Sequence, residues 1–307
     1  MGGSPCTKWS IAQKNGREVL PEGIGWELFE NYRIAQDKFQ PDIFLYENNK
    51  SAAQPIKDAI YTALGGDINP DVYLTYIDSA LVSAQRRQRF YVTNFGKIEQ
   101  PKDRGILLRD ILETGWTTDR DKSRTVLSSI GRTTTREYFD HSQNTMVYYS
   151  LSKVIPVNTT VDGKGRTLCG EGGGVGAKTG LYAVPTMEAM DKPIYEVRDG
   201  LITIKEKRYP VKLKDGYYLI RKLTPIECER LQTMPDCYTS AVSNSQRYRA
   251  LGNGFTAEVI IHILNHALKD VPRDEELVVL SMYDGIGTGR YCLDKMGFKI
   301  LSIMLTR

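Results

Sequence analysis

A single cysteine near the start of the chain stands where it can act as a nucleophile. Cys6 follows Pro5 in a segment that also contains Gly2, Gly3 and Ser4. A loop built from glycine and proline can hold a cysteine exposed in an electropositive setting, which favours the reactive thiolate. Most isolated cysteines have a structural role, so this segment alone does not decide whether Cys6 is a nucleophile or a structural residue.

A carboxylate and two arginines accompany two apolar runs. Glu47 follows the run 43–46 directly, and ligand sites of open α/β sheets lie at such strand ends. Arg87 and Arg89 stand at alternate positions just before the run 90–94, so both side chains can point into one site. The alternative for Glu47 is an ordinary salt bridge with one of these arginines.

A glycine-rich turn lies near the end of the chain. Gly285, Gly287 and Gly289 come directly after the apolar run 277–283. Glycines between a strand and a helix let the backbone approach a ligand closely. The pattern is weak by itself, and its position after a strand is what makes it informative.

Six segments together resemble the C5 cytosine-specific DNA methyltransferase family, in its bacterial or phage type. Any one of them would be a modest hint, but six at plausible spacing make chance agreement negligible. The resemblance covers nearly the whole chain outside residues 96–222. The segments are Gly3–Cys6, Glu47–Asn49, Gln85–Arg89, Leu223–Asp236, Arg249–Phe255 and Leu280–Gly289.

The resemblance implies methylation of cytosine at C5, with S-adenosyl-L-methionine as cofactor and double-stranded DNA as partner. Cys6 would attack C6 of the base, which creates an enamine whose C5 can take a methyl group. Glu47 would bind or protonate N3, Arg89 would hold O2, and Arg87 would steady the site and a nearby phosphate. The target base has to leave the duplex to reach these groups.

The same resemblance implies a cofactor site at the glycine turn. Tyr283 would lie against the adenine, and Gly252–Asn253 would contact the methionine end. Leu28 would line the same pocket, with plain core packing as the alternative for this residue.

The order of the motifs departs from the family pattern. The catalytic cysteine opens the chain and the cofactor motif closes it, which predicts a circular permutation joined through the connector Asp270–Glu276. The family segment that supplies acids for the ribose and the adenine amine, and the strand leading into Pro-Cys, has no match here. We expect residues 300–307 to be a frameshifted reading of a longer gene, and a genuine short tail in a split enzyme is the alternative.

Two classes of function follow from this pattern. The first is a DNA (cytosine-5-)-methyltransferase of restriction-modification type, which is either completed by a second polypeptide supplying the missing cofactor-site strands or is a truncated product. The second is a catalytically incomplete DNA-binding module of methyltransferase descent. RNA methylation is less favoured, because an insert of roughly 125 residues suits sequence reading of duplex DNA.

These motifs require an α/β scaffold. Alternating apolar strands and helices over residues 1–95 and 223–307 predict two segments of a catalytic core. By resemblance this core is a Rossmann-like S-adenosylmethionine-dependent methyltransferase fold, permuted and lacking some strands. The runs 43–46 and 90–94 are predicted to be buried parallel strands.

Local signals also predict individual helices. Apolar residues share one face over 51–64, and a second helix is expected over 255–269. Thr224 and Pro225 are suited to the start of a helix, and Gly297 is suited to the end of the last one.

Residues 96–222 differ in character from their surroundings. Gly, Thr, Ser, Arg and Tyr dominate, which predicts a small β-rich domain. Residues 96–220 hold 20 Lys+Arg against 16 Asp+Glu, and this difference equals the net charge of +4 of the whole chain. We predict that this region is the target-recognition domain and contacts the major groove of DNA. Ordinary solvated charge is the alternative.

Other features argue against a membrane, secreted or metal protein. The chain has no long apolar run and opens without a signal sequence, and its five cysteines include no CxxC pair, so we expect a cytoplasmic protein. His141, His262 and His266 do not form part of a recognisable metal-binding pattern in the sequence, and we expect no metal site. Residues 172–179 resemble a phosphate loop, but Ala177 replaces a required glycine, which favours a flexible loop.

Overall fold

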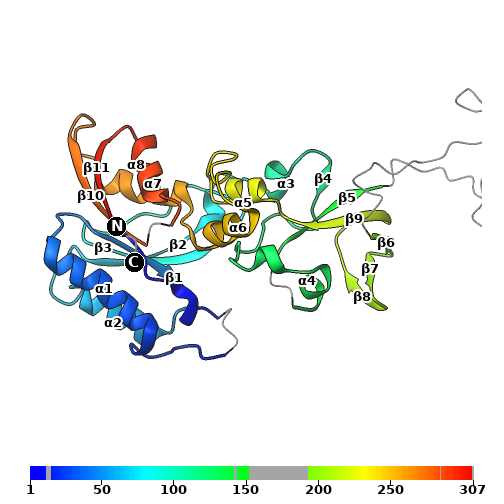
Figure 1. Cartoon of the computed structure of the whole chain (residues 1–307), viewed down its shortest axis with the longest axis horizontal. Coiled ribbons are helices and arrows are strands. Elements are labelled where there is room, and N and C mark those ends of the chain that lie inside the picture. Colours follow the sequence, from blue (N-terminus) through cyan, green and yellow to red (C-terminus); the bar gives the residue numbers. More distant parts are fainter. Residues whose placement is uncertain (12–14, 142–143, 152–192, 284, 306–307) are drawn as a thin grey trace, which may run out of the picture. The chain divides into compact units, whose positions relative to one another are not determined.

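The computed structural model describes residues 1–11, 15–141, 144–151, 193–283 and 285–305. The chain divides into two compact units, which Figure 1 shows in cartoon form. The core unit comprises Met1–Ile111, Lys122–Arg132 and Thr224–Arg307, and the inserted unit comprises Leu112–Asp121 and Thr133–Leu223. No helix among the described residues has the length and apolar character needed to cross a bilayer.

The core unit alternates helices and strands along most of its length. Its elements are η1 (Cys6–Lys8), α1 (Gly23–Phe39), β1 (Leu45–Asn49), α2 (Gln54–Ala63), β2 (Tyr73–Asp78), η2 (Ser79–Leu81), β3 (Gln88–Thr93), α3 (Leu108–Ile111), η3 (Ile130–Arg132), α5 (Pro225–Leu231), α6 (Asn244–Asn253), α7 (Ala257–Ala267), β10 (Glu276–Met282), α8 (Thr288–Lys295) and β11 (Lys299–Leu305).

The strands of the core unit pair in two groups. One group has the order β1-β3-β2, with β3 antiparallel to both neighbours, and in the other β10 and β11 are parallel. The prediction that residues 90–94 form a parallel strand is therefore wrong. The link between β2 and β3, residues 79–87, is shorter than the dozen or more residues that a parallel crossover needs.

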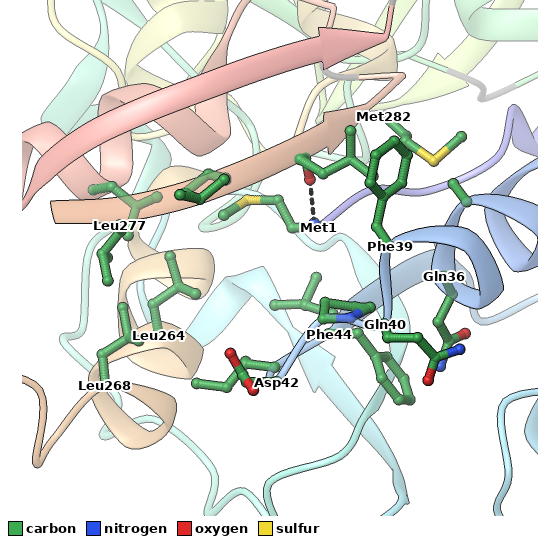
Figure 2. A pocket seen from close by; sticks show the side chains of 18 of the residues that line it. Met1, Gln36, Phe39, Gln40, Asp42, Phe44, Leu264, Leu268, Leu277 and Met282 are labelled. Atoms are coloured by element: carbon green, nitrogen blue, oxygen red, sulfur yellow. Dashed lines mark hydrogen bonds between the residues drawn. The ribbon is translucent and has the colours of Figure 1, made fainter.

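Gly2 joins the two groups of strands into one sheet. It forms parallel bridges with Tyr46 of β1 and with Met282 of β10. A Cβ atom on this residue would lie 2.6 Å from the Met282 carbonyl oxygen, so only glycine allows this approach. Away from Gly2, β1 and β10 separate around a cavity (Figure 2).

Helices cover both faces of this sheet. Helices α1 and α2 lie on one face, and α7 and α8 lie on the other (Figure 1). The first face carries a core that includes Phe29, Ile56 and Phe90. The second carries a core that includes Ile260 and Leu293. This layered arrangement confirms the predicted α/β, Rossmann-like fold class.

The local helix signals were read correctly. Thr224 caps α5 through its side chain, and Glu227 completes a reciprocal capping box. The helices expected over 51–64 and 255–269 are present as the slightly shorter α2 and α7. Gly297 follows α8 with φ of 83°, the left-handed geometry that ends a helix.

The inserted unit is built mainly of strands. They form a six-stranded antiparallel sheet in the order β4-β5-β9-β6-β7-β8, with buried aromatic residues such as Tyr148 and Tyr218 in its core. Residues 172–179 lie outside the described part of the chain. The elements are β4 (Trp116–Thr117), α4 (Thr135–His141), β5 (Met146–Ser150), β6 (Ile194–Arg198), β7 (Leu201–Ile204), β8 (Lys207–Pro210) and β9 (Gly216–Lys222).

The boundaries of this unit differ from the predicted range 96–222. Residues 96–111 and 122–132 belong to the core unit. Lys122 explains the second of these segments, because its Nζ donates hydrogen bonds to the carbonyl oxygens of Ala80, Ser83 and Ile106. A shift in composition does not reveal such a contact.

Candidate active site

Glu47 and Arg89 form an ion pair near the middle of the sheet. Arg89 Nε lies 2.8 Å from Glu47 Oε1, and the side chains are only 8% and 12% exposed. Burial raises the pKa of the Glu47 carboxyl, and the positive charges of Arg89 and Arg87 oppose that rise. The salt bridge considered as an alternative is thus present, and it is buried.

The Pro-Cys segment runs against Glu47. A Cβ atom on Gly3 would lie 2.4 Å from the Glu47 carbonyl oxygen and 3.0 Å from Oε2, so a side chain at this position would collide with Glu47. Cys6 begins η1 only a few residues further along the chain. Its side chain lies outside the described part of the structure.

A buried polar cluster fixes the start of this loop. The hydroxyls of Ser4 and Tyr46 lie 2.7 Å apart, and Asn48 Nδ2 donates to the Ser4 carbonyl oxygen at 2.9 Å and to the Tyr46 hydroxyl at 3.0 Å. All three residues are buried. A buried network whose members satisfy one another holds its backbone rigidly, so the residue before Pro5 is anchored to β1.

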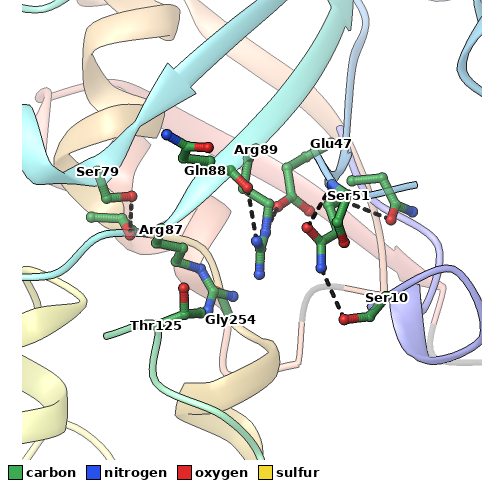
Figure 3. A network of polar contacts seen from close by, with 12 residues as sticks. Ser10, Glu47, Ser51, Ser79, Arg87, Gln88, Arg89, Thr125 and Gly254 are labelled. Atoms are coloured by element: carbon green, nitrogen blue, oxygen red, sulfur yellow. Dashed lines mark hydrogen bonds and ion pairs between the residues drawn. The ribbon is translucent and has the colours of Figure 1, made fainter. Parts of the chain in front are cut away.

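A cavity of about 820 Å³ opens beside these groups. This volume is within the usual range for small-molecule sites, which is on the order of 300–1,000 Å³. Figure 3 shows the polar side chains that gather at this edge of the sheet. The residues that line the cavity include Thr7, Ser10, Asn49, Arg86, Arg89 and Asn253.

Arg87 braces the wall of this cavity. Its guanidinium donates to the carbonyl oxygens of Val126 at 3.3 Å, Gly252 at 3.1 Å and Gly254 at 2.7 Å. Figure 3 shows the side chain of Arg87 next to Gly254. The residue is 2% exposed. Arg87, just before β3, thus holds backbone carbonyl groups. Arg89, in β3, holds the Glu47 carboxylate.

The glycine turn after β10 has an unusual backbone. Tyr283, Gly285 and Gly287 have φ values of 57°, 60° and 72°, all in the left-handed region that favours glycine. Gly287 caps α8, and Gly289 lies buried in the first turn of that helix. Unpaired N–H groups at a helix start favour polar or anionic ligands.

Two other predicted residues border this turn. The Tyr283 hydroxyl donates to the Leu28 carbonyl oxygen at 3.2 Å, so the backbone of Leu28 supports the tyrosine. Asn253 ends α6 and lines the cavity. A Cβ atom on the neighbouring Gly254 would lie 3.6 Å from the Ile286 side chain, which places this segment between the cavity and the turn.

Several supporting residues were not identified from the sequence. Gln85 Nε2 donates to the Leu231 carbonyl oxygen at 2.7 Å and to Gln232 Oε1 at 2.9 Å. Gln232 Nε2 in turn donates to the Leu251 carbonyl oxygen at 2.6 Å. The only sequence feature that could have pointed to these two glutamines is that both lie within segments that resemble the methyltransferase family. Tyr238 donates to the Ile286 carbonyl oxygen at 3.0 Å and had no sequence signal.

His262 and His266 each contact a neighbouring residue. His262 Nε2 is 2.8 Å from the Glu99 carbonyl oxygen, and the His266 ring lies 6.2 Å from that of Phe95. The His141 side chain is outside the described part of the structure. Among the residues that the structure describes, no group of three or more metal-ligating side chains lies together.

Comparison with known proteins decides the family. Residues 1–269 match the sequence profile of the C-5 cytosine-specific DNA methylases. This chain belongs to the C-5 cytosine-specific DNA methylase family. It is 24% identical over 282 residues to the type II methyltransferase M.HhaI of Haemophilus parahaemolyticus, a match covering 85% of this chain and 72% of the relative. It is 25% identical over 272 residues to M.HpaII of Haemophilus parainfluenzae, a match covering 84% of this chain and 68% of that relative.

Two further proteins are similar to this chain over different lengths. The DNA (cytosine-5)-methyltransferase DRM2 of Oryza sativa subsp. japonica is 33% identical over 89 residues, which span 29% of this chain and only 14% of that protein. The crystal structure of S. pombe Dnmt2 methyltransferase aligns over 82% of this chain and 75% of that one, with 12% identity and a TM-score of 0.43.

The cofactor of this DNA methylase family is S-adenosyl-L-methionine, and the turn after β10 fits it. The fit rests on the left-handed glycines and on two buried hydroxyls beside the turn. Ser281 Oγ and Thr288 Oγ1 are buried without a hydrogen-bond partner among the described residues. Buried hydroxyls are normally satisfied, so these two favour a polar ligand at the turn.

Proposed function

We propose that this chain is the catalytic part of a DNA (cytosine-5-)-methyltransferase. It would transfer a methyl group from S-adenosyl-L-methionine to C5 of a cytosine flipped out of a specific duplex sequence. The observation that carries this proposal is the buried Glu47–Arg89 pair, which lies against Gly3 of the Pro-Cys segment. We place the reaction in the cytoplasm, as part of a restriction-modification system.

Each residue has a defined part in the proposed reaction. The Cys6 thiolate adds to C6 of the base while Glu47 gives a proton to N3, and the electron pair is then available at C5. Arg89 holds O2 and keeps the base in register with Glu47. When bound, S-adenosyl-L-methionine supplies the methyl group. Loss of the C5 proton to solvent and of the thiolate from C6 restores the aromatic ring and returns the N3 proton to Glu47.

The raised pKa of Glu47 supports its role as the proton donor. An ordinary carboxyl has lost its proton at neutral pH, whereas burial extends the pH range over which Glu47 keeps one. Arg89, 2.8 Å away, orients this group and limits the rise. Tyr283, Leu28, Asn253 and the glycines of the turn would hold the cofactor.

The inserted unit is proposed to read the target sequence. It is a separate compact unit with a sheet of its own, and its chain segments lie between catalytic segments of the core unit. Exchange of this unit with that of a relative should change the methylated sequence. An unchanged target sequence would refute this assignment.

We also propose that the core is permuted and that a second polypeptide completes its sheet. The order of the segments supports the permutation, because Cys6 precedes and the glycine turn at residues 285–289 follows the other site residues along the chain. The second polypeptide is proposed because the family segment that supplies acids for the ribose and the adenine amine has no match in the sequence. The test is transfer of labelled methyl groups to duplex DNA by the purified chain, alone and with candidate partner chains. Binding of DNA without methyl transfer under every condition would favour the incomplete DNA-binding module instead.

A further inference from the structure

The loop between α5 and α6 sends one tyrosine side chain to the glycine turn. The Tyr238 hydroxyl donates to the Ile286 carbonyl oxygen at 3.0 Å, and a Cβ atom on Gly287 would lie 3.8 Å from that hydroxyl. The Tyr238 ring meets the ring of Tyr291 in α8 edge-on, with 5.5 Å between the centroids. One side chain thus contacts both the turn and the helix that follows it.

The residue that Tyr238 holds lies at the most adaptable point of the turn. Ile286 stands between Gly285 and Gly287, whose φ values of 60° and 72° are in the left-handed region. Glycine has access to more backbone conformations than any other residue, so the peptide groups between two glycines rotate easily unless another group restrains them. The hydrogen bond from Tyr238 restrains the Ile286 carbonyl group.

Holding this carbonyl group also sets the direction of an N–H group. The Ile286 C=O and the Gly287 N–H belong to one planar trans peptide, in which the two groups point to opposite sides. Because the carbonyl oxygen is directed to Tyr238, the Gly287 N–H is directed away from the tyrosine. Gly287 is the N-cap of α8, and N–H groups at a helix start favour polar or anionic ligands.

A buried carboxylate holds Tyr238 in turn. The Glu229 side chain in α5 is fully buried, and it accepts the N–H groups of Cys237 and Thr239 at 2.8 Å each. These are the residues on either side of Tyr238. Arg247 lies 2.9 Å from the same carboxylate and balances its charge. The backbone around Tyr238 is therefore fixed by the core unit independently of the turn.

The ring and the hydroxyl of Tyr238 have separate contacts. The ring packs with Ile286 and Tyr291 against the core that includes Ile260 and Leu293. A phenylalanine would keep this packing, because it differs from tyrosine only in the hydroxyl. Removal of the hydroxyl therefore separates the effect on the turn from the effect on the core.

We propose that Tyr238 is a positioning residue of the cofactor site. Its hydroxyl fixes the Ile286 carbonyl group, and this presents the Gly287 N–H to a hydrogen-bond acceptor of S-adenosyl-L-methionine. Glu229 acts through Tyr238, because it fixes the loop that carries the tyrosine. The inference rests on the proposed function only in placing the cofactor at the turn, and it requires neither DNA nor methyl transfer.

Tyr238→Phe tests the proposal through binding of S-adenosyl-L-homocysteine, which lacks the reactive methyl group. Calorimetry of the chain without DNA should give a Kd about fivefold higher than for wild type, the usual effect of one lost hydrogen bond. The matched control, Tyr218→Phe, removes a hydroxyl that donates to the Lys214 carbonyl oxygen at 2.8 Å in the inserted unit, and should leave the Kd unchanged. Equal Kd values for wild type and Tyr238→Phe, or no binding by wild type, would overturn the proposal.

Amide hydrogen exchange without ligand gives a readout that a packing role would not change. Tyr291 N donates to the Gly287 carbonyl oxygen at 3.0 Å, so exchange at this amide reports how well the turn is held. Exchange there should be roughly threefold faster in Tyr238→Phe, and exchange at Leu268 in the core unit should not change. Unchanged exchange at Tyr291 would show that the hydroxyl does not position the turn.

A second substitution tests the part assigned to Glu229. Glu229→Gln should raise the Kd for S-adenosyl-L-homocysteine in the wild-type background and have no further effect in a protein that already carries Tyr238→Phe, because effects that act through one group are not additive. Additive effects, or no effect in either background, would contradict a role through Tyr238. A chain that shows the expected binding pattern and never methylates DNA refutes only the proposed function.

Discussion

Arg89 reaches Glu47 diagonally across the sheet. In the ladder Glu47 is level with Tyr91, and Arg89 is level with Asn49, yet Arg89 Nε lies 2.8 Å from Glu47 Oε1. Diagonal neighbours on adjacent strands are within reach of a side chain as long as arginine. One carboxylate oxygen therefore faces Arg89, while the other lies on the side of Gly3 and the Pro-Cys segment.

Replacement of Glu47 by Gln should lower the rate of methyl transfer by roughly 10²–10⁴-fold, because the proton donor to N3 is lost. The pKa of Glu47 is raised, so its proton persists to higher pH than on an ordinary carboxyl. The single-turnover rate of the wild-type protein should fall as pH rises through that pKa. The Gln variant should lack this step, and the exposed control Glu99→Gln should keep it. A step that persists in Glu47→Gln would contradict the assignment.

Replacement of Cys6 by Ser should abolish covalent trapping on duplex DNA that carries 5-fluorocytosine. The reason is that fluorine cannot leave C5 as a proton does, so a thiolate that has added to C6 remains attached. Gel analysis under denaturing conditions measures the trapped complex. Cys237→Ser, which removes an exposed thiol, should trap normally. Trapping by Cys6→Ser would show that another group is the nucleophile.

Arg87→Lys should reduce the free energy of unfolding by about 3 kcal/mol, because Arg87 reaches one carbonyl oxygen from Nη1 and two from Nη2, and the single ammonium nitrogen of a lysine cannot occupy both positions. The carbonyl oxygens of Val126, Gly252 and Gly254 are the groups that lose a donor. Urea unfolding provides the measurement. The control Arg109→Lys, at a side chain 70% exposed, should change stability by less than about 0.5 kcal/mol. Equal losses in the two variants would contradict a bracing role.

Glu229 should make the stability of the core unit depend on acidic pH. Burial tends to raise its pKa, but hydrogen bonds from Thr239 and Arg247 outweigh burial and hold the pKa below the usual value. A lowered carboxyl pKa stabilises the fold above the pKa of the unfolded chain, and this stability is lost as pH falls through the folded-state pKa.

The corresponding experiment compares unfolding free energies of wild type and Glu229→Gln between pH 7 and pH 3. The variant should be less stable at neutral pH, and the difference between the two proteins should shrink toward pH 3. The exposed control Glu27→Gln should follow the wild-type curve. A difference that stays constant with pH would rule out the ionised form of Glu229 as the source of the stability.

The sequence identified the elements whose signals are local. Thr224 and Gly297 mark helix ends through their own chemistry, and the glycine turn follows an apolar strand that the sequence makes plain. The residues Cys6, Glu47 and Arg89 were chosen by motif, and the structure brings the Glu47–Arg89 pair against the segment that leads to Cys6.

The features that the sequence did not reveal depend on contacts between distant segments. Lys122 holds carbonyl groups of Ala80, Ser83 and Ile106, which moves a segment from the inserted unit into the core unit. Gln85 is fully buried because its partner Gln232 arrives from 147 residues away. Neither lysine nor glutamine carries a local signal for contacts of this kind, so only the folded chain shows these roles.

The bridging position of Gly2 has a practical consequence for mutagenesis of the protein. Its backbone pairs with Tyr46 on one side and with Met282 on the other, and a Cβ atom there would lie 2.6 Å from the Met282 carbonyl oxygen. A side chain at this one position would therefore push apart the strand that carries Glu47 and the strand that leads into the glycine turn. Random libraries that cover the segment before Cys6 should keep Gly2 unchanged, because a loss of activity there would report a displaced strand and not a lost chemical group.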